Sequence, residues 1–361
     1  MRRKPQQGRE KAGDAPKHPE FEDRPVRGER GRAPVTGPRR GEADWIRHIQ
    51  RTWGPSGAEV DLGDDACVLP PARYAVTTDA LVEGVDFERR WAPPEALGHK
   101  ALAANLSDLA AVGAMPRFLL LTLGIPDGLE DGYVEGLLDG MRNLARREGV
   151  GLCGGDLSGS PGGLVLSLTL IGLAGDRPLT RAGGRPGDAL YLSGSVGGAR
   201  AALRAFQQGA VLDRFEEAPP KDPVQGLLDR FYRPPAQTLL GLSLARPGGA
   251  TCCIDVSDGL ALDLHRLCGA SGCGAVVEAE RIPVDPRAGE WSEESAREAV
   301  LGGEDQVLLF AAGGEPDPEW VGAAGPPFRI GRLVEGEALE LRWPGGRSEP
   351  LLPRGFDHFV R

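Results

Sequence analysis

The chain has 361 residues, of which 40% are hydrophobic and 26% charged, so it can build a large core and is long enough for two domains. Its net charge of −10 is unevenly distributed, because residues 1–40 carry a net charge of +6 and the rest a net charge of −16. An acidic body repels phosphate backbones, which argues against a nucleic-acid-binding enzyme. The basic segment 1–40 lacks apolar periodicity and is rich in Pro, Gly, Arg and Gln, so we expect a disordered extension.

The apolar segments exclude a membrane-spanning protein. The longest run, near Phe118 to Pro126, is far shorter than the roughly 20 residues that cross a bilayer. No apolar stretch follows the basic N-terminus, as a secretory signal requires. We therefore expect a cytoplasmic protein with no membrane partner. The six cysteines form no C-x-x-C pair and are interpreted as small buried hydrophobic residues rather than zinc ligands.

Apolar periodicity predicts alternating strands and helices on both sides of residues 176–181, which indicates two α/β domains, 41–177 and 178–361. The first is expected to contain a helix over 43–52, strands over 64–69 and 74–78, a helix over 94–111, a strand over 117–124, a helix over 130–148, a strand over 150–153, a Gly-rich loop over 154–163 and a strand over 164–172. The second is expected to contain strands over 189–193, 250–254, 274–279 and 306–311 and helices over 197–208, 235–245, 258–270 and 292–301, with a Pro-rich connection over 212–223.

Acidic residues recur beside Gly, Ser or Thr where a predicted strand meets a loop or a helix. They are Asp64 and Asp65, Asp79, Asp156, Asp255 and Asp258, and Glu304 and Asp305; Asp108, inside a predicted helix, is the exception. Carboxylates gathered at such junctions repel one another unless a cation neutralises them, and hard oxygen ligands of this kind suit Mg²⁺. The pattern therefore favours phosphoryl transfer assisted by several magnesium ions.

Each motif alone also has an ordinary structural interpretation. Asp64-Asp65 and Glu304-Asp305 could form turns, and Ser257-Asp258 could begin a helix. Asp79 could cap a helix or close a turn. The sequence contains no G-x-x-x-x-G-K-[ST] motif, so bound ATP would depend on metal ions and backbone amides more than on lysine. The acidic sites taken together, rather than any one of them, favour a metal site.

Eight segments resemble, in order, the thiamine-monophosphate kinases, which belong to the aminoimidazole-ribonucleotide-synthetase-like (PurM-like) superfamily. They are LGDDACVL, TTDALVEGVDF, GHKALAANLSDLAAVGAMP, GGDLSGS, LTRAGGRPGDALYLSG, IDVSDGLALDLHRLCGASGCGA, LGGEDQVLLF and GFDHF, between about Glu42 and Phe359. The resemblance implies an α/β (α+β) two-domain PurM-like fold whose N-terminal sheet forms a barrel with that of a second copy in a homodimer. It also implies direct, in-line phosphoryl transfer from ATP to thiamine monophosphate, giving thiamine diphosphate without a protein nucleophile.

The resemblance further implies roles for individual residues. The expected magnesium ligands are Asp65, Thr77, Thr78, Asp79, Asp108, Asp156, Asp255 and Asp258. The expected nucleotide contacts are Gly155, Asp156, Arg181 and Ser257. Asp86, Glu304 and Phe356 would contact the substrate, where a carboxylate and an aromatic ring both attract the cationic thiamine.

Three positions depart from the family pattern. Asp86 stands where His is usual, Leu157-Ser158 follows the GGD loop in place of a basic contact, and Phe356 replaces the commoner Tyr. An acid at position 86 would repel the acceptor phosphate unless a metal bridges them. The departures leave open a non-catalytic nucleotide-binding regulatory protein, or another PurM-like ATP-dependent enzyme.

Overall fold

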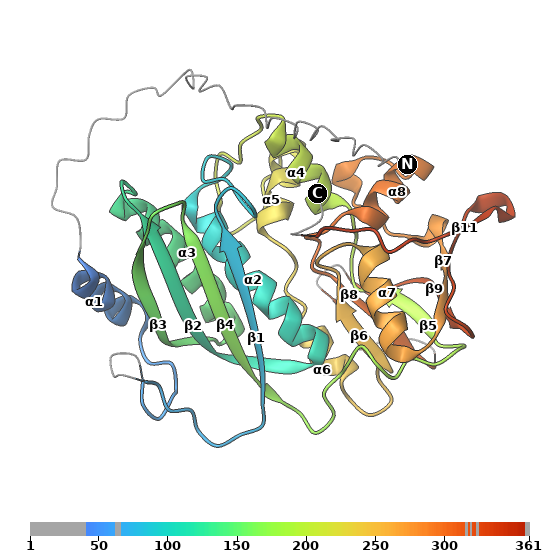
Figure 1. The fold of residues 1–361 in the computed structure, drawn as a ribbon, viewed down its shortest axis with the longest axis horizontal. Coiled ribbons are helices and arrows are strands. Elements are labelled where there is room, and N and C mark those ends of the chain that lie inside the picture. The colour runs from blue at the N-terminus through green and yellow to red at the C-terminus, as the bar shows by residue number, and fades with distance from the viewer. Residues whose placement is uncertain (1–40, 62–65, 315–316, 318–319, 323–324, 358–361) are drawn as a thin grey trace, which may run out of the picture. The chain divides into compact units, whose positions relative to one another are not determined.

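A computed structural model describes residues 41–61, 66–314, 317, 320–322 and 325–357 (Figure 1). In the N-terminal half, four strands form a sheet in the order β1-β4-β2-β3. Strand β3 runs parallel to β2, and the other pairs are antiparallel. The bounds are β1 Tyr74–Val82, β2 Ala114–Pro126, β3 Gly151–Ser160 and β4 Val165–Ala174.

Three helices accompany this sheet, α1 Glu42–Trp53, α2 Pro94–Val112 and α3 Asp131–Glu148. Helices α2 and α3 lie together on one face of the sheet, and their apolar side chains share its core (Figure 1). Glycines let the two helices approach closely: a Cβ on Gly98 would lie 1.9 Å from the carbonyl oxygen of Leu137. The other face of the sheet has no such helical cover within the described residues, and Val76 on β1 is 62% exposed.

The C-terminal half contains a seven-stranded mixed sheet in the order β11-β10-β7-β9-β5-β8-β6. Alternate residues of β8 enter two different cores, Leu309 and Ala311 on one face and Leu308 and Phe310 on the other. Both faces of this sheet are therefore buried. The bounds are β5 Ala189–Leu192, β6 Cys252–Asp255, β7 Gly274–Glu278, β8 Leu308–Ala312, β9 Phe328–Val334, β10 Leu339–Arg342 and β11 Ser348–Pro350.

Helix α2 connects the two halves. Leu102 and Leu106 pack in the N-terminal core, whereas Ala110 and Ala111 join Phe310 in the core of the second sheet. Helices α7 and α8 pack on the opposite face of that sheet. The remaining helices are α4 Gly198–Gln207, α5 Pro223–Tyr232, α6 Thr238–Leu244, α7 Leu260–Ser271 and α8 Glu293–Leu301, with short 3₁₀ turns η1 Ala279–Arg281, η2 Pro286–Ala288 and η3 Pro344–Gly346.

One predicted loop was wrong, and helix α5 and strands β9, β10 and β11 were not predicted. The expected loop over 154–163 continues as strand β3 to Ser160, because its backbone pairs with β2 and its glycines permit close contact. A Cβ on Gly155 would lie 1.9 Å from the carbonyl oxygen of Leu121. The expected connection over 212–223 is followed by an unpredicted helix, α5, which begins at Pro223 after the Asp222 carboxylate caps the Gln225 amide.

Some expectations are not tested by the described residues. Segment 1–40 and residues 64 and 65 of the expected strand over 64–69 lie outside them. Residues 66–69 are described and form no strand, only an isolated bridge between Val68 and Val60. The domain limits 41–177 and 178–361 remain a prediction. Among the described helices, none combines the length and the apolar character needed to cross a bilayer.

Candidate functional site

A tight turn between β6 and α7 carries three of the predicted site residues. Asp255 ends β6 and is 5% exposed, and Ser257 and Asp258 follow it in the turn. One carboxylate oxygen of the fully buried Asp263 accepts hydrogen bonds from the amides of Ser257, Asp258 and Gly259, at 3.1, 3.0 and 3.1 Å. The Asp263 carboxylate, in the first turn of α7, therefore holds the three backbone amides of the turn in place, as expected for an acid at the start of a helix.

Arg266 ties this carboxylate to the predicted metal ligand beside it. Its Nη1 donates to Asp263 at 2.7 Å and to Asp258 at 2.6 Å. Burial raises the pKa of Asp263, although the backbone amides and Arg266 oppose that shift. Asp258 thus belongs to a connected network, and its side chain is not simply an N-cap.

The loop between α8 and β8 packs on the same turn. The Glu304 amide donates to the Ser257 carbonyl at 2.7 Å, and the Gln306 amide donates to Val256 at 2.8 Å. Glu304 has φ of 70°, a left-handed conformation that non-glycine residues adopt uncommonly. Such strain often marks a functional site when the surroundings hold it in place.

Glu304 has a partner from the other half of the molecule. Lys100 of α2 donates to its carboxylate at 2.6 Å and to the Phe231 carbonyl at 3.1 Å. Lys100 is buried, and its ammonium group lies 3.5 Å from the centre of the Phe231 ring. The Glu304 carboxylate, which is the predicted contact for thiamine, is therefore paired with a lysine ammonium group that offsets its charge and fixes its orientation.

The C-terminal segment reaches this turn as well. The Phe356 amide donates to the Asp258 carbonyl at 2.9 Å, and the Phe356 side chain is 47% exposed. A Cβ on Gly355 would lie 2.5 Å from the same carbonyl oxygen, so glycine is needed for the approach. An exposed aromatic ring thus stands beside the turn that carries Asp258.

The N-terminal half contributes carboxylates from β1 and α2. Thr77 donates to Asp108 at 2.5 Å, which places Thr77 and, two residues later, Asp79 on the face of β1 that α2 covers. Thr78 points to the opposite face, where its hydroxyl donates to the Leu168 carbonyl at 2.9 Å. The structure therefore brings Thr77, Asp79 and Asp108 together and sets the Thr78 hydroxyl apart.

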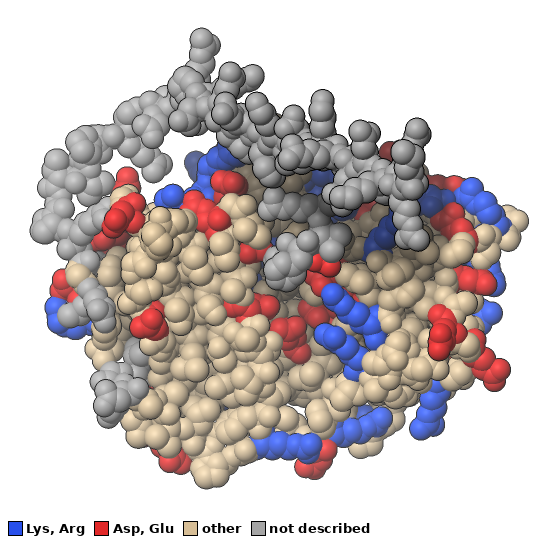
Figure 2. Space-filling view, viewed as in Figure 1, with Lys and Arg blue, Asp and Glu red and all other residues tan. Residues whose placement is uncertain are grey.

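A direct hydrogen bond joins the two halves at the centre of the site. Ser107, next to Asp108 on α2, donates to Asp255 at 3.0 Å, and both groups are buried. Burial, followed by the charge of Asp108, raises the pKa of Asp255 to about 8. Figure 2 shows acidic side chains gathered in the middle of the view, where the two halves meet, with basic side chains beside them.

The same crowding affects the other two carboxylates. Burial raises the pKa of Asp79 to about 7, with further contributions from the charges of Asp108, Glu304, Asp258 and Asp86. Burial also raises the pKa of Asp108, whereas the hydroxyl of Thr77 and the charge of Arg181 lower it. Perturbed carboxylates that converge from both halves are typical of a functional site.

Arg181 and Asp86 lie at the margin of this cluster. The backbone of exposed Arg181 is anchored by the Ser271 hydroxyl, which donates to its carbonyl at 2.8 Å. Asp86 accepts a hydrogen bond from the Val82 amide at 2.7 Å and so caps the turn after β1. The carboxylate at position 86 therefore has a local structural role, whatever its effect on substrate.

Asp156 and Gly155 are not brought to the cluster by one chain. Asp79 pairs with Leu168, Leu168 with Leu121, and Leu121 with Gly155, so Asp79 and Gly155 lie on opposite edges of the sheet. Asp79 and Gly155 are separated by three strand spacings, or about 14 Å. Asp156 is the next residue after Gly155, so its exposed side chain lies on the face of the sheet opposite α2. Asp65 lies outside the described residues.

The donor set is compatible with magnesium. Asp79, Asp108 and Asp255 are hard oxygen donors whose charges are incompletely balanced by protein cations. Within the described residues, no three His, Cys, Asp or Glu side chains are arranged to hold an ion by themselves. Mg²⁺ takes one or two carboxylates and completes its shell with water and substrate phosphates, so it does not require such a group of three.

Sequence reasoning missed four residues of this site, namely Lys100, Ser107, Asp263 and Arg266. Lys100 could have been noticed, because it is a lysine inside an apolar helix and Ser107, seven residues later, lies on nearly the same helical face. Asp263 likewise follows the expected ligand Asp258 by five residues within one predicted helix. The position of Lys100 did not reveal its partner, since Glu304 is 204 residues away. The partners of Asp263 are local, namely the amides of Ser257, Asp258 and Gly259 and the side chain of Arg266.

Comparison with known proteins identifies the fold and the family. Residues 63–174 match the N-terminal domain of AIR synthase related proteins, and residues 185–344 match the C-terminal domain. The thiamine-monophosphate kinase of Rhodopirellula baltica is 32% identical over 318 residues, which cover 83% of this chain and 91% of the relative.

Solved structures agree. The thiamine-monophosphate kinase of Stenotrophomonas maltophilia K279a superposes with a TM-score of 0.71 at 33% identity, covering 82% of this chain and 94% of that one. AaThiL complexed with AMPPCP and TMP superposes with a TM-score of 0.66 at 29% identity, covering 86% of this chain and 96% of that one. The expected two-domain PurM-like fold is confirmed, and the chain belongs to the thiamine-monophosphate kinase family.

Proposed function

We propose that this protein transfers the γ-phosphate of ATP to the phosphate of thiamine monophosphate, giving ADP and thiamine diphosphate. The observation that supports this most is the buried hydrogen bond between Ser107 and Asp255, which joins carboxylates of both halves into one cluster. The family to which the chain belongs points to the same pair of substrates. So does the solved complex of AaThiL with TMP and AMPPCP, an ATP analogue.

Two anionic phosphates must approach within bonding distance, and their mutual repulsion is the main electrostatic obstacle. We infer that Asp79, Asp108, Asp255 and Asp258 hold several Mg²⁺ ions, which when bound would neutralise both phosphates and stabilise the charge of the transition state. The raised pKa values of Asp79 and Asp255 support this role, because burial and then the neighbouring carboxylates disfavour their charged forms, and a nearby cation would favour them.

The chain's own residues would then position the reactants. Arg181, exposed near Asp108, is suited to a nucleotide phosphate because its guanidinium group forms bidentate hydrogen bonds. Glu304, held by Lys100, and the exposed ring of Phe356 would receive the cationic thiamine. Positioning and charge neutralisation suffice for in-line transfer, so we expect no phosphoenzyme intermediate.

We further infer a homodimer that uses the open face of the N-terminal sheet. Val76, Thr78 and Ala80 of β1 are exposed on that face, and Val76 is an apolar residue with 62% of its surface exposed. Light scattering should give twice the chain mass at micromolar concentration, and Val76→Glu should shift the protein toward monomer. A wild-type monomer under the same conditions would contradict the assignment.

A single-turnover experiment tests the activity. The protein, in excess over radiolabelled ATP with magnesium, is mixed with thiamine monophosphate or with other phosphorylated acceptors. We expect label to move to thiamine diphosphate only when thiamine monophosphate is present. Tight nucleotide binding without transfer to any acceptor would instead favour a regulatory protein, and preference for a different acceptor would favour another PurM-like enzyme.

A further inference from the structure

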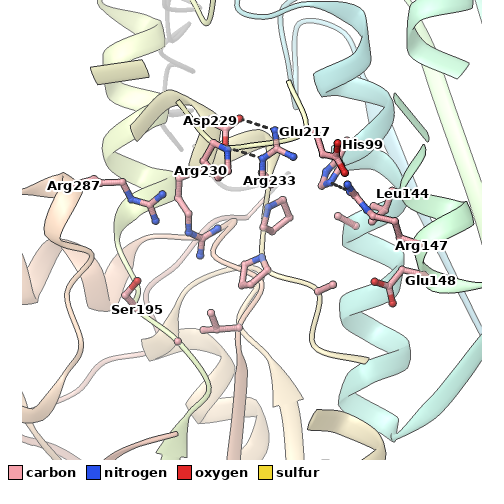
Figure 3. Close-up of a pocket in the computed structure, with 17 residues that line it drawn as sticks. His99, Leu144, Arg147, Glu148, Ser195, Glu217, Asp229, Arg230, Arg233 and Arg287 are labelled. Atoms are coloured by element: carbon pink, nitrogen blue, oxygen red, sulfur yellow. Dashed lines mark hydrogen bonds and ion pairs between the residues drawn. The ribbon is translucent and has the colours of Figure 1, made fainter. Parts of the chain in front are cut away.

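A second pocket lies apart from the carboxylate cluster. It has a volume of about 470 Å³, and α2, α3, α5 and the loop that precedes α4 contribute to its wall (Figure 3). None of the proposed metal ligands lines it. Four arginines do, and they come from three segments, namely α3, the end of α5 and η2: Arg147, Arg230, Arg233 and Arg287.

Arg230 is the least satisfied of these arginines. Its side chain is 5% exposed, and its Nη2 donates to the Asp305 carbonyl at 2.7 Å. The nearest carboxylate oxygens, on Asp305 and Asp285, lie at 3.6 and 3.7 Å, beyond hydrogen-bonding distance. Within the described part of the chain, its buried Nη1 has no hydrogen-bond partner. A buried guanidinium group with a free N–H edge is unusual and costly.

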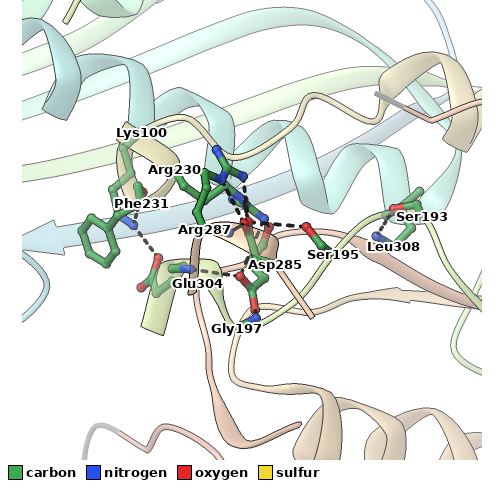
Figure 4. Close-up of polar contacts among 12 residues, drawn as sticks. Lys100, Ser193, Ser195, Gly197, Arg230, Phe231, Asp285, Arg287, Glu304 and Leu308 are labelled. Carbon is green, nitrogen blue, oxygen red and sulfur yellow. Dashed lines mark hydrogen bonds and ion pairs between the residues drawn. The ribbon is translucent and has the colours of Figure 1, made fainter. Parts of the chain in front are cut away.

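The two neighbouring carboxylates are committed elsewhere (Figure 4). Asp285 accepts two hydrogen bonds from the Arg287 guanidinium, at 2.9 and 2.7 Å. Asp305 accepts from the amides of Gly197 and Ala199 at the start of α4, at 2.6 and 3.2 Å. Neither can turn toward Arg230 without leaving other buried donors unpaired.

Arg147, on the opposite wall, adds a second cation. Its Nη2 lies 3.2 Å from Nε2 of His99, and burial lowers the pKa of His99 to about 3, so the imidazole is neutral. This hydrogen bond therefore leaves the charge of Arg147 uncompensated. Arg233, in contrast, forms a two-point ion pair with Asp229, at 2.9 and 3.1 Å.

Acidic groups limit what the pocket can hold. Glu148, Glu217 and Asp229 also line it, so its total charge is close to balanced. Attraction of any polyanion by net charge alone is therefore not expected. The free N–H groups instead favour a small anion with several oxygens that can accept directional hydrogen bonds.

We propose that this pocket binds a phosphate group, either as free phosphate or as part of a small phosphorylated molecule. Guanidinium groups match phosphate oxygens in geometry and charge, and Arg230 and Arg147 offer such donors from opposite walls of the pocket. The volume exceeds the space that one phosphate needs, so a diphosphate or a larger phosphorylated compound fits the same chemistry.

The test uses the full chain in EDTA at pH 8, where the metal-free carboxylate cluster repels anions. Orthophosphate and, separately, pyrophosphate are titrated by calorimetry. We expect saturable binding of one anion per chain. Arg147→Gln should weaken it by about ten-fold or more, because a charge-assisted contact is lost. Arg230→Lys keeps the positive charge but removes the planar guanidinium group with its paired N–H donors, so it should also weaken anion binding.

Matched variants make the result decisive. Arg146→Gln changes the neighbouring exposed arginine, whose Nη2 donates to the Thr52 carbonyl at 3.2 Å and which does not line the pocket. It should leave the affinity unchanged, as should Arg181→Gln in the proposed nucleotide site. Absence of saturable binding to wild type would overturn the proposal. So would equal affinities for Arg147→Gln and Arg146→Gln in folded protein, or loss of binding in Arg181→Gln alone.

Discussion

Replacing Asp79 by Asn should stabilise the metal-free protein while abolishing its activity. Burial and neighbouring acids raise the pKa of this carboxyl from 3.8 to about 7. The folded state therefore binds the proton more tightly than the unfolded state does. The stability that Asp79 contributes is fully present below about pH 4 and is lost as the pH rises through about 7. Asn cannot ionise, so it avoids this loss.

A shift of about 3 pKa units corresponds to at most about 4 kcal/mol, since one unit is worth about 1.4 kcal/mol. Water reaches this partly exposed carboxylate and screens its neighbours, so we expect a gain of about 2 kcal/mol at pH 8. Urea unfolding in EDTA at pH 8 and pH 5 measures it, and the gain at pH 5 should be less than half as large. Magnesium should stabilise wild type more than the variant.

The control for this experiment is Asp176→Asn, which removes an exposed carboxylate remote from the cluster in sequence and should change stability little. If Asp79→Asn were less stable than wild type at pH 8 without metal, the reasoning from carboxylate repulsion would fail. If it kept normal turnover, Asp79 would not be a metal ligand.

Three further substitutions separate substrate contacts from supporting contacts. Lys100→Met removes the partner of Glu304 and should raise KM for thiamine monophosphate about ten-fold by steady-state assay, with a smaller change in KM for ATP; equal changes in both would contradict this. Asp86→Asn keeps an acceptor for the Val82 amide but removes the charge, so KM for thiamine monophosphate should fall about two- to five-fold; an increase would show that the carboxylate binds substrate. Asp263→Asn should lower kcat about 100-fold with an unchanged circular dichroism spectrum, because it disturbs the three amides that fix the turn; normal kcat would show that the turn holds without it.

Much of the carboxylate cluster could be predicted because strand ends are readable from the sequence. Asp255 ends strand β6 as expected, and Asp108 lies on the apolar helix α2. Asp79 was expected to follow a strand over 74–78 but lies inside β1, which continues to Val82. Ligands commonly gather at such ends, so the pattern of acids beside Gly, Ser and Thr was informative. The expected convergence of carboxylates from the two halves agrees with the Ser107–Asp255 hydrogen bond.

Sheet order was not readable in the same way. The sequence gives no indication that β4 and β2 separate β1 from β3, which places Asp156 on the edge opposite Asp79. Glycines made segment 154–163 look like a loop, although in β3 they allow close contact with β2. The role predicted for Asp156 therefore requires a contribution that one chain does not provide, such as a second copy.

Long-range partners were also hidden. Lys100 and Glu304 are separated by 204 residues, and pairing between such distant positions leaves no local pattern. Helix α5 was missed because Pro223 and Gly226 are typical of turns, yet Pro is well tolerated in the first turn of a helix. Tertiary packing on α4, through residues such as Phe231, stabilises this helix where local propensity does not.

In the proposed reaction, carboxylates from both halves of the molecule act through magnesium on two phosphates at once. The most direct measurement is the initial rate of thiamine diphosphate formation as free Mg²⁺ is varied at saturating magnesium-ATP and thiamine monophosphate. We expect the rate to keep rising after all ATP is complexed, with ADP and thiamine diphosphate formed in equal amounts. No thiamine diphosphate at any magnesium concentration, or a rate independent of free Mg²⁺, would contradict it.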